Sequence, residues 1–185
     1  MKRKFLLYLC LATLTQCSKC KNDPTPADPA AQLPPATQTG ANTFGCLVNG
    51  QPYTPGGGSN GTPSYAVIYD PGYQGGSLDV RTYRYPDAQS LKKQRLSLGG
   101  ININHAGVYL IGASPDTGAG FTDEYRTSPC DTYRSDQANG YSKGSITITR
   151  LDLQAGIISG TFAFTLAQPG CDTIKVTQGR FDKKL

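Results

Sequence analysis

The chain has 185 residues, a formal net charge of +5 at pH 7, and a single histidine. Three of the positive charges belong to Lys2, Arg3 and Lys4, so the rest of the chain carries +2 (5 − 3) and lacks the dense cationic face that nucleic-acid binding requires. The basic residues between 81 and 95 are interpreted as solvated charge beside a loop. Because Glu124 is the only glutamate, few groups remain for acid–base catalysis, and we expect neither an enzyme nor a nucleic-acid partner.

The start of the chain resembles the signal sequence of a bacterial lipoprotein. Its apolar run of about ten residues, Phe5–Leu14, is shorter than the roughly 20 residues needed to span a bilayer. The run ends at Leu14-Thr15-Gln16-Cys17, which corresponds to the lipobox of such a leader. We therefore predict that residues 1–16 are a signal peptide and that cleavage leaves Cys17 as the lipid-bearing N-terminus. Gln16 stands where lipoboxes usually carry a small residue, so ordinary secretion and an uncleaved anchor stay open as alternatives.

Residues 17–41 are predicted to form a lipid-bearing, disordered tether. They are rich in Pro, Ala, Thr, Gln and Asp and contain almost nothing to bury. Such a segment cannot offset its ordering entropy, and its prolines favour local polyproline II structure. At about 3 Å per residue, it could reach at most roughly 70 Å. The remaining residues, 42–185, are predicted to form a single β-rich domain.

Short runs with apolar residues at every second position dominate the predicted domain. Phe162, Phe164 and Leu166 alternate with smaller residues, and Ile174 and Val176 repeat the pattern. A period of two is typical of strands with one buried face. Short links join the last three runs, which favours an antiparallel meander at the C-terminus. We expect an all-β fold, either an antiparallel β-sandwich or a strongly bent β-barrel.

Turn sequences such as Asn49-Gly50 and Gln168-Pro169-Gly170 separate the runs. Two runs change their apolar parity at glycine, one at Gly99-Gly100 and one at Gly179. Glycine at such a position indicates a bulge or a sharp bend. The predicted strands lie near residues 43–48, 51–54, 64–69, 76–85, 91–103, 107–111, 121–126, 144–153, 156–167 and 172–183.

Six cysteines are present, of which Cys10 lies in the predicted leader and Cys17 at the predicted lipidation site. The other four thiols allow three full pairings. We predict a disulfide between Cys130 and Cys171, because both lie in loop sequences and an exported protein meets oxidising conditions. Closing a loop of about 42 residues stabilises a fold by roughly 4 kcal/mol in the chain-entropy estimate.

The two other thiols are expected to stay unpaired. Cys20 lies in the predicted tether. Cys46 shares its parity with Phe44 and Val48, so it is interpreted as a buried thiol that packs as a small apolar side chain.

Three features resemble catalytic or metal-binding chemistry, and each has a simpler interpretation. Asp116-Thr117-Gly118-Ala119 matches the tetrapeptide around an aspartic-protease carboxylate, but the chain has one copy where two are needed, and a turn explains it. His105 lies in a polar stretch that predicts a hairpin turn. Asp116, Asp123 and Glu124 offer hard oxygen ligands for calcium without a defined loop motif. We therefore expect no catalytic residue, no metal and no cofactor.

The strand predicted at 76–85 carries a candidate binding patch. If Val80 faces the core, then Arg81, Tyr83 and Tyr85 all face outward. Tyrosine and arginine anchor interfaces, and tyrosine rings also stack on sugars. Arg81, Tyr83 and Tyr85 are therefore candidates for contact with a glycan or an envelope protein. Ordinary cross-strand pairing on a solvated sheet is the alternative.

Four segments of the predicted domain share a pattern with known sequences: 43–50 (TFGCLVNG), 144–152 (GSITITRLD), 158–164 (ISGTFAF) and 174–182 (IKVTQGRFD). They resemble a group of uncharacterised lipoproteins from Bacteroidota-type bacteria, whereas residues 56–140 show no such resemblance. The resemblance implies an outer-membrane lipoprotein with a β-rich domain of unknown function, which faces either the periplasm or the outside. It brings no catalytic residues.

Together, these features predict a protein anchored to the outer membrane through lipid on Cys17 and carrying a non-catalytic binding or scaffold module. Two alternatives stay open. One is a hydrolase of envelope or extracellular polymers, and the other is a purely structural envelope lipoprotein.

Overall fold

The computed structural model describes residues 28–57, 63–87 and 89–185, and their regular structure is almost entirely β. No helix in these segments is long and apolar enough to cross a membrane. The elements are η1 (Pro29–Gln32), a short 3-10 helix, and the strands β1 (Thr43–Val48), β2 (Gln51–Tyr53), β3 (Tyr65–Asp70), β4 (Ser77–Arg84), β5 (Gln94–Gly100), β6 (Gly107–Ile111), β7 (Thr117–Asp123), β8 (Thr132–Arg134), β9 (Tyr141–Asp152), β10 (Ile157–Ala167) and β11 (Ile174–Lys184).

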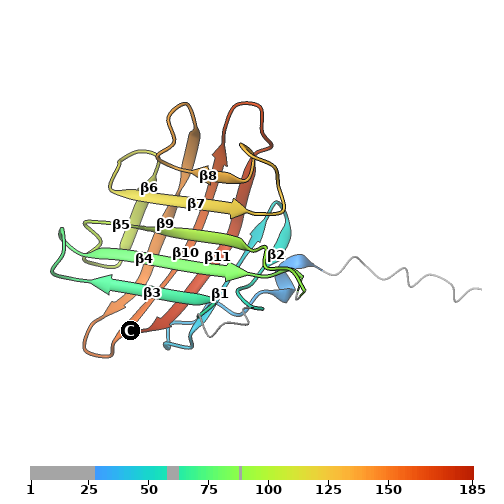
Figure 1. Ribbon diagram of the computed structural model, residues 1–185. Helices are drawn as coiled ribbons and strands as arrows, with labels where there is room; N and C mark the ends of the chain where they lie inside the picture. The colour runs from blue at the N-terminus through green and yellow to red at the C-terminus, as the bar shows by residue number, and fades with distance from the viewer. Residues whose placement is uncertain (1–27, 58–62, 88) are drawn as a thin grey trace, which may run out of the picture.

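The strands form two antiparallel sheets that pack face to face (Figure 1). The six-stranded sheet has the order β2-β1-β11-β10-β9-β6, and the five-stranded sheet has the order β3-β4-β5-β7-β8. The strands of one sheet cross those of the other steeply (Figure 1). The predicted all-β fold is confirmed, and of the two predicted forms the structure is the sandwich. The predicted C-terminal meander is confirmed as β9, β10 and β11, which are neighbours in chain order.

The core lies between the sheets and is built from alternate positions of their strands. In β4, Leu78, Val80 and Thr82 face inward, whereas Asp79 and Arg81 face outward. Removal of such inward-facing apolar side chains from water is the main favourable contribution to folding. The large side chains of the opposing sheet that meet this core are Phe44, Tyr53, Ile146, Ile148, Ile158, Phe162, Phe164, Leu166 and Phe181.

A bulge in β11 lies where the sequence changes parity, as predicted. Phe162 of β10 pairs with Gly179, but Phe164 pairs with Val176, so β11 contains one extra residue between the two pairs. A Cβ on Gly179 would lie 2.4 Å from Cδ2 of Phe162, which leaves no room for another residue type beneath this ring. Gln178 beside it has a φ of 52°, in the left-handed region.

The start of β7 differs from the prediction. β7 begins at Thr117, before its predicted start, and Thr117, Ala119 and Phe121 face inward. Between them lie Gly118 and Gly120, which have no side chains, so the usual alternation of apolar and polar residues is hidden in the sequence.

The short strand β8 was absent from the prediction because it contains a single apolar residue, Tyr133. Tyr133 is 1% exposed and pairs with Phe121 of β7. Just before β8, Cys130 forms the predicted disulfide with Cys171, with 5.5 Å between their Cα atoms. Cys171 lies between β10 and β11, so this bond ties the end of one sheet to the end of the other.

Cys46 is fully buried in β1, which confirms its interpretation as a core thiol. Burial raises the pKa of this thiol to about 12, despite the positive charges of Arg84 and Arg180. The thiol is therefore neutral and unreactive at pH 7.

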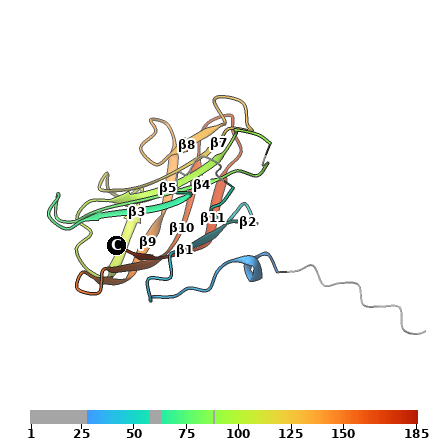
Figure 2. The ribbon, with the colours of Figure 1, turned by 60° about the horizontal axis from the view of Figure 1, so that its bottom comes forward.

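Residues 28–41 lie against the outer face of the six-stranded sheet (Figure 2), and we call this segment the strap. Leu33 is 8% exposed, and a Cβ on Gly45 of β1 would lie only 2.6 Å from Cδ of Pro34. The predicted boundary at residue 42 is thus corrected, because the packed part of the chain includes residues 28–41. Residues 17–27 of the predicted tether, and with them Cys17 and Cys20, lie outside the described residues.

The strap is held by Asp182 of β11, whose side chain is 1% exposed. Burial would raise the pKa of Asp182, but hydrogen bonds from Ser159, Thr37 and the strap backbone outweigh it and hold the pKa well below its usual range. Ser159 of β10 donates from Oγ at 2.7 Å. The strap donates to the same carboxylate, at 2.7–3.1 Å, from Thr37 Oγ1 and from the N–H groups of Thr39, Gly40 and Ala41.

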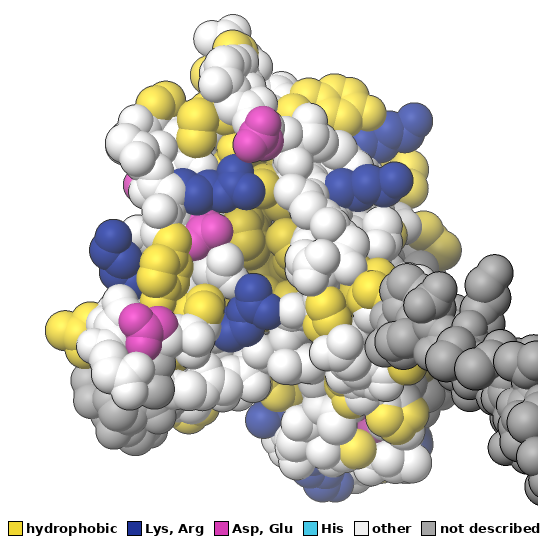
Figure 3. Space-filling model, turned by 90° about the vertical axis from the view of Figure 1, so that its right-hand side faces the viewer, with side chains coloured by type: hydrophobic (Ala, Val, Ile, Leu, Met, Phe, Trp, Pro, Cys, Tyr) yellow, Lys and Arg dark blue, Asp and Glu magenta, His cyan; other side chains and the backbone are white. Residues whose placement is uncertain are grey.

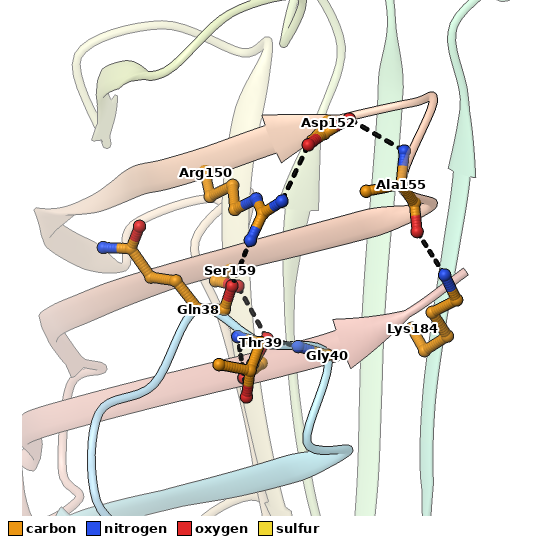
Figure 4. A network of polar contacts seen from close by, with 9 residues as sticks. Gln38, Thr39, Gly40, Arg150, Asp152, Ala155, Ser159 and Lys184 are labelled. Carbon is orange, nitrogen blue, oxygen red and sulfur yellow. Dashed lines mark hydrogen bonds and ion pairs between the residues drawn. The ribbon is translucent and has the colours of Figure 1, made fainter.

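Arg150 of β9 extends this network along the sheet (Figure 4). Its Nη1 donates to the carbonyl of Gln38 in the strap at 2.6 Å, and its Nη2 pairs with Asp152 at 2.7 Å. Arg150, Ser159 and Asp182 are consecutive partners across β9, β10 and β11. A row of three polar residues on adjacent strands therefore anchors the strap.

Candidate functional site

A groove of about 900 Å³ lies on the outer face of the five-stranded sheet. This sheet is the layer farther from the strap (Figure 2). Its floor lies where β5 pairs with β7 and is made by Ser97, Gly99, Gly118 and Gly120. Three of these four positions have no side chain, so the backbone itself forms much of the floor. Residues 112–115, between β6 and β7, line one side. We call this feature the groove.

The strand register places two arginines on opposite sides of the floor. One row of paired residues crosses β4, β5, β7 and β8, and it consists of Arg81, Ser97, Gly120 and Arg134 in that order. At about 4.8 Å per strand, the Cα atoms of the two arginines are roughly 14 Å apart. Arg134 lines the groove, and Arg81 is the strand partner of the floor residue Ser97.

A second row runs beside the first and adds hydroxyl groups. It crosses the same four strands and consists of Tyr83, Arg95, Thr122 and Thr132 in that order. Arg95, Thr122 and Thr132 line the groove. The two rows together surround a backbone floor with guanidinium and hydroxyl groups.

Two of the three arginines are paired with aspartates on the same face. Arg81 Nε donates to Oδ1 of Asp79 at 3.0 Å, and Arg134 forms two parallel bonds to Asp136 at 2.8 and 2.6 Å. The hydrogen bond from Arg134 holds the pKa of Asp136 below its usual range. Arg95 is exposed and has no ion pair among the described residues. Exposed pairs of this kind contribute little to stability, but they orient their charged groups.

Of the predicted patch of Arg81, Tyr83 and Tyr85, the first two are strand partners of groove residues, whereas Tyr85 is not. The outward orientation of Arg81 and Tyr83 is confirmed. The Tyr83 ring is half-buried, with Nζ of Lys93 5.8 Å from its centre. Tyr85 lies past the end of β4, where its N–H donates to the carbonyl of Gly56 at 3.1 Å.

His105 lies exposed in the loop before β6, outside the groove lining. Its Nδ1 lies 2.7 Å from Oδ1 of Asn104, and its backbone carbonyl accepts a hydrogen bond from the Tyr109 hydroxyl at 2.8 Å. No carboxylate is among its hydrogen-bond partners in the described chain.

The three acids considered for calcium each have a separate partner. Asp116 accepts a bond from the Asn102 amide at 2.9 Å, Asp123 from the Gln94 amide at 2.9 Å, and Glu124 from the N–H of Lys93 at 3.1 Å. Within residues 28–57, 63–87 and 89–185, no three His, Cys, Asp or Glu side chains gather as metal ligands. The Asp116–Ala119 motif instead leads into β7 and supplies Gly118 to the floor.

A polar network at the end of the sandwich was not predicted. Arg84 donates to Oε1 of Gln94 at 3.0 Å and to the carbonyl of Pro52 at 2.5 Å. Gln94 donates to Asp123 at 2.9 Å, and Arg126 lies 3.5 Å from the same oxygen. Figure 3 faces this end and shows hydrophobic side chains in a hollow bordered by Lys and Arg side chains. Since these polar groups satisfy one another, we do not assign a ligand to them.

The groove itself was also missed from the sequence, although a signal was present. Ser97 and Gly99, and Gly118 and Gly120, place small residues at every second position of two strands. Two such strands side by side produce a hollow face, but the sequence does not reveal that β5 and β7 are neighbours.

Comparison with known proteins identifies a family without assigning an activity. The sequence model of one family, described as Domain of unknown function (DUF6252), matches residues 76–183. This is more than half of the chain, so the protein belongs to that family. The matched stretch includes much of the 56–140 region, for which no resemblance was recognised, and excludes 43–50. No curated protein and no solved structure matches the chain.

Proposed function

We propose that this member of a family of unknown function is a lipid-anchored envelope protein that binds a glycan chain in the groove and does not transform it. The groove on the five-stranded sheet is the observation that carries the proposal. Its volume of about 900 Å³ lies within the usual range of ligand sites, roughly 300–1,000 Å³.

The chemistry of the lining suits sugar hydroxyl groups, which both donate and accept hydrogen bonds. Arg134 and Arg95 supply donors, Asp79 and Asp136 supply acceptors, and Thr122 supplies a hydroxyl group that does either. The ion pairs of Asp79 and Asp136 hold the acceptors in place before a ligand arrives. The groove is also open to solvent, so one stretch of a longer sugar chain can enter it.

The positions of the strap and groove support an anchored protein that carries its ligand site on the sheet opposite the strap. The strap lies on the outer face of one sheet and the groove on the outer face of the other (Figure 2). Eleven residue steps separate Cys17 from Asp28, which limits the reach between them to about 38 Å. If Cys17 carries lipid, this reach keeps the sandwich close to the outer membrane.

The groove lining supports binding without turnover. Its only carboxylates are Asp79 and Asp136, and each is tied to an arginine. Glycoside cleavage uses two carboxyl groups with separate acid and base roles. Neither His105 nor Glu124 lies in this lining.

A variant that fills the groove tests the proposal. A Cβ on Gly120 would meet only Oγ of Ser97 at 3.2 Å and the Tyr133 carbonyl at 3.4 Å, so Gly120→Phe fills the floor with a small adjustment. Gly72→Phe, in the β3–β4 turn, is the matched control, because only Asp70 Oδ1 lies near its Cβ, at 3.5 Å.

The measurement is binding of the full-length protein, purified in detergent, to an array of envelope and extracellular polysaccharides. We expect at least one polysaccharide to bind, Gly120→Phe to weaken binding at least tenfold, and Gly72→Phe to leave it unchanged. No binding by the native protein, or equal binding by Gly120→Phe, would refute the proposal. Release of shorter sugar fragments would instead support the hydrolase alternative.

A further inference from the structure

The three arginines on the outer face of the five-stranded sheet differ in whether they have an ion-pair partner. Arg81 and Arg134 each pair with an aspartate, so two positive and two negative charges balance. Arg95 has no such partner among the described residues and is exposed. Its neighbours in register are Tyr83 and Thr122, neither of which is a carboxylate. The groove therefore keeps one uncompensated positive charge, at Arg95.

Glu124, two residues after Thr122, is an acidic residue close to Arg95 in the strand register, but it is not an ion-pair partner of Arg95. Its carboxylate accepts from the N–H of Lys93 at 3.1 Å and lies 3.8 Å from the Lys93 ammonium group. Lys93 also lies over the Tyr83 ring. These contacts leave the Arg95 guanidinium group available to solvent or to a ligand.

We infer that the groove selects a glycan that bears carboxylate groups and that Arg95 contacts one of these carboxylates; the inference rests on the proposed glycan-binding function. A guanidinium group offers two parallel N–H donors that match the two oxygens of a carboxylate. Arg95 lies four residues before Gly99 on β5, so roughly 13 Å of small-residue floor extends along the strand from the contact. An acidic sugar bound at Arg95 can therefore lay its neighbouring rings along Ser97 and Gly99.

The lining also favours an acidic glycan over an acidic peptide. Arg95 has room for one carboxylate, and the aspartates paired with the other two arginines, Asp79 and Asp136, keep acceptor oxygens on the same face. The same aspartates accept hydrogen bonds from sugar hydroxyl groups, which an acidic peptide lacks. An acidic peptide is therefore the alternative that the experiment must separate.

The experiment compares polygalacturonate with its carboxyl-reduced form, which keeps the sugar chain and removes the charge, and with polyglutamate, which keeps the charge and removes the sugar. Binding to the full-length native protein is measured by calorimetry in detergent at low and moderate salt. We expect polygalacturonate to bind at least tenfold more tightly than either of the other two polymers. Arg95→Ala should remove this preference, and Arg95→Lys should restore part of it.

Lys175→Ala is the matched control, because it removes one exposed positive charge from β11 in the other sheet. It should leave the preference unchanged. Equal binding of the acidic and reduced polysaccharides, or an unchanged preference in Arg95→Ala, would overturn this inference and leave glycan binding standing. Tighter binding of polyglutamate would overturn it in favour of an acidic peptide. If neither polysaccharide bound while other glycans did, the inference alone would fail; if no glycan bound, the proposed function would fail with it.

Discussion

The carboxylate of Asp182 holds the strap, and its replacement by asparagine has a consequence that can be worked out from the structure. The change preserves shape but removes the charge and turns one acceptor oxygen into an NH2 donor. In one orientation this donor faces the N–H of Gly40, and in the other it faces the N–H groups of Thr39 and Ala41. At least one backbone N–H therefore loses its acceptor.

A hydrogen bond to a charged group contributes about 1.5–3 kcal/mol, and an unsatisfied donor costs about 1–3 kcal/mol. We expect Asp182→Asn to lower the free energy of unfolding at pH 7 by about 3 kcal/mol, because release of the strap lets water satisfy its N–H groups and limits the loss. Urea unfolding of the full-length protein measures the change. Hydrogen exchange should show loss of protection at Thr39, Gly40 and Ala41. Asp136→Asn, which removes an exposed carboxylate, is the control and should cost no more than about 1 kcal/mol.

The loss should also depend on pH with a defined sign. The pKa of Asp182 is lowered in the folded state. Its stabilisation is therefore complete above the unfolded-state pKa of about 3.9 and is lost as pH falls through the lowered folded-state pKa. The difference between native protein and Asp182→Asn should stay constant from pH 7 to 5 and shrink by about 1.4 kcal/mol per pH unit below pH 4. Equal losses in Asp182→Asn and Asp136→Asn, or a difference that does not shrink in acid, would refute this account of the strap.

Two further predictions concern the cysteines. Replacement of both Cys130 and Cys171 by serine should lower the free energy of unfolding by up to about 4 kcal/mol, because the disulfide closes a loop with a sequence separation of 41 residues. Urea unfolding measures the change. A loss of less than about 1 kcal/mol would contradict the stabilising role of this bond. Cys17→Ala should abolish incorporation of a labelled fatty acid and move the protein from the detergent phase to the aqueous phase, whereas Cys20→Ala should do neither. Unchanged labelling of Cys17→Ala would exclude Cys17 as the lipidation site.

The parts of the fold that were predictable are those in which local pattern decides structure. In β10, Phe162, Phe164 and Leu166 occupy every second position, and each faces the core between the sheets. The parity change at Gly179 predicted a bulge that the register confirms. These signals need only a few consecutive residues, since the period of a strand is two.

The strap could not be predicted because its contacts are polar and distant in the sequence. Thr37 and Asp182 are 145 positions apart, and no apolar run marks the segment between η1 and β1. A composition rich in proline and threonine was interpreted as lacking the means to offset ordering entropy. In the structure, one buried carboxylate provides that means through hydrogen bonds to the backbone of Thr39, Gly40 and Ala41.

The groove was hidden for a different reason, which is that its defining residues have no side chains. In the sequence, nothing distinguishes Arg95 and Arg134 from other arginines. Only the pairing of β5 with β7, and of β7 with β8, brings them around one floor. The predicted patch at Arg81 and Tyr83 lies next to that floor. The emphasis on aromatic rings overlooked the glycines that create the hollow, and binding by Arg81, Tyr83 and Tyr85 stays a prediction.

The boundaries of the family match have a consequence for which part of the chain is the functional unit. The match begins at residue 76, yet β1 lies between β2 and β11 in the six-stranded sheet. Phe44 of β1 stacks on Phe162 with 5.3 Å between ring centres, and Cys46 is fully buried beside it in the core. Without β1, the inner strand β11 would become an exposed edge and Phe162 would lose a partner. The structural unit that presents the groove therefore extends back to the strap, and residues 28–57 and 63–75 are as much a part of it as the described part of the matched segment.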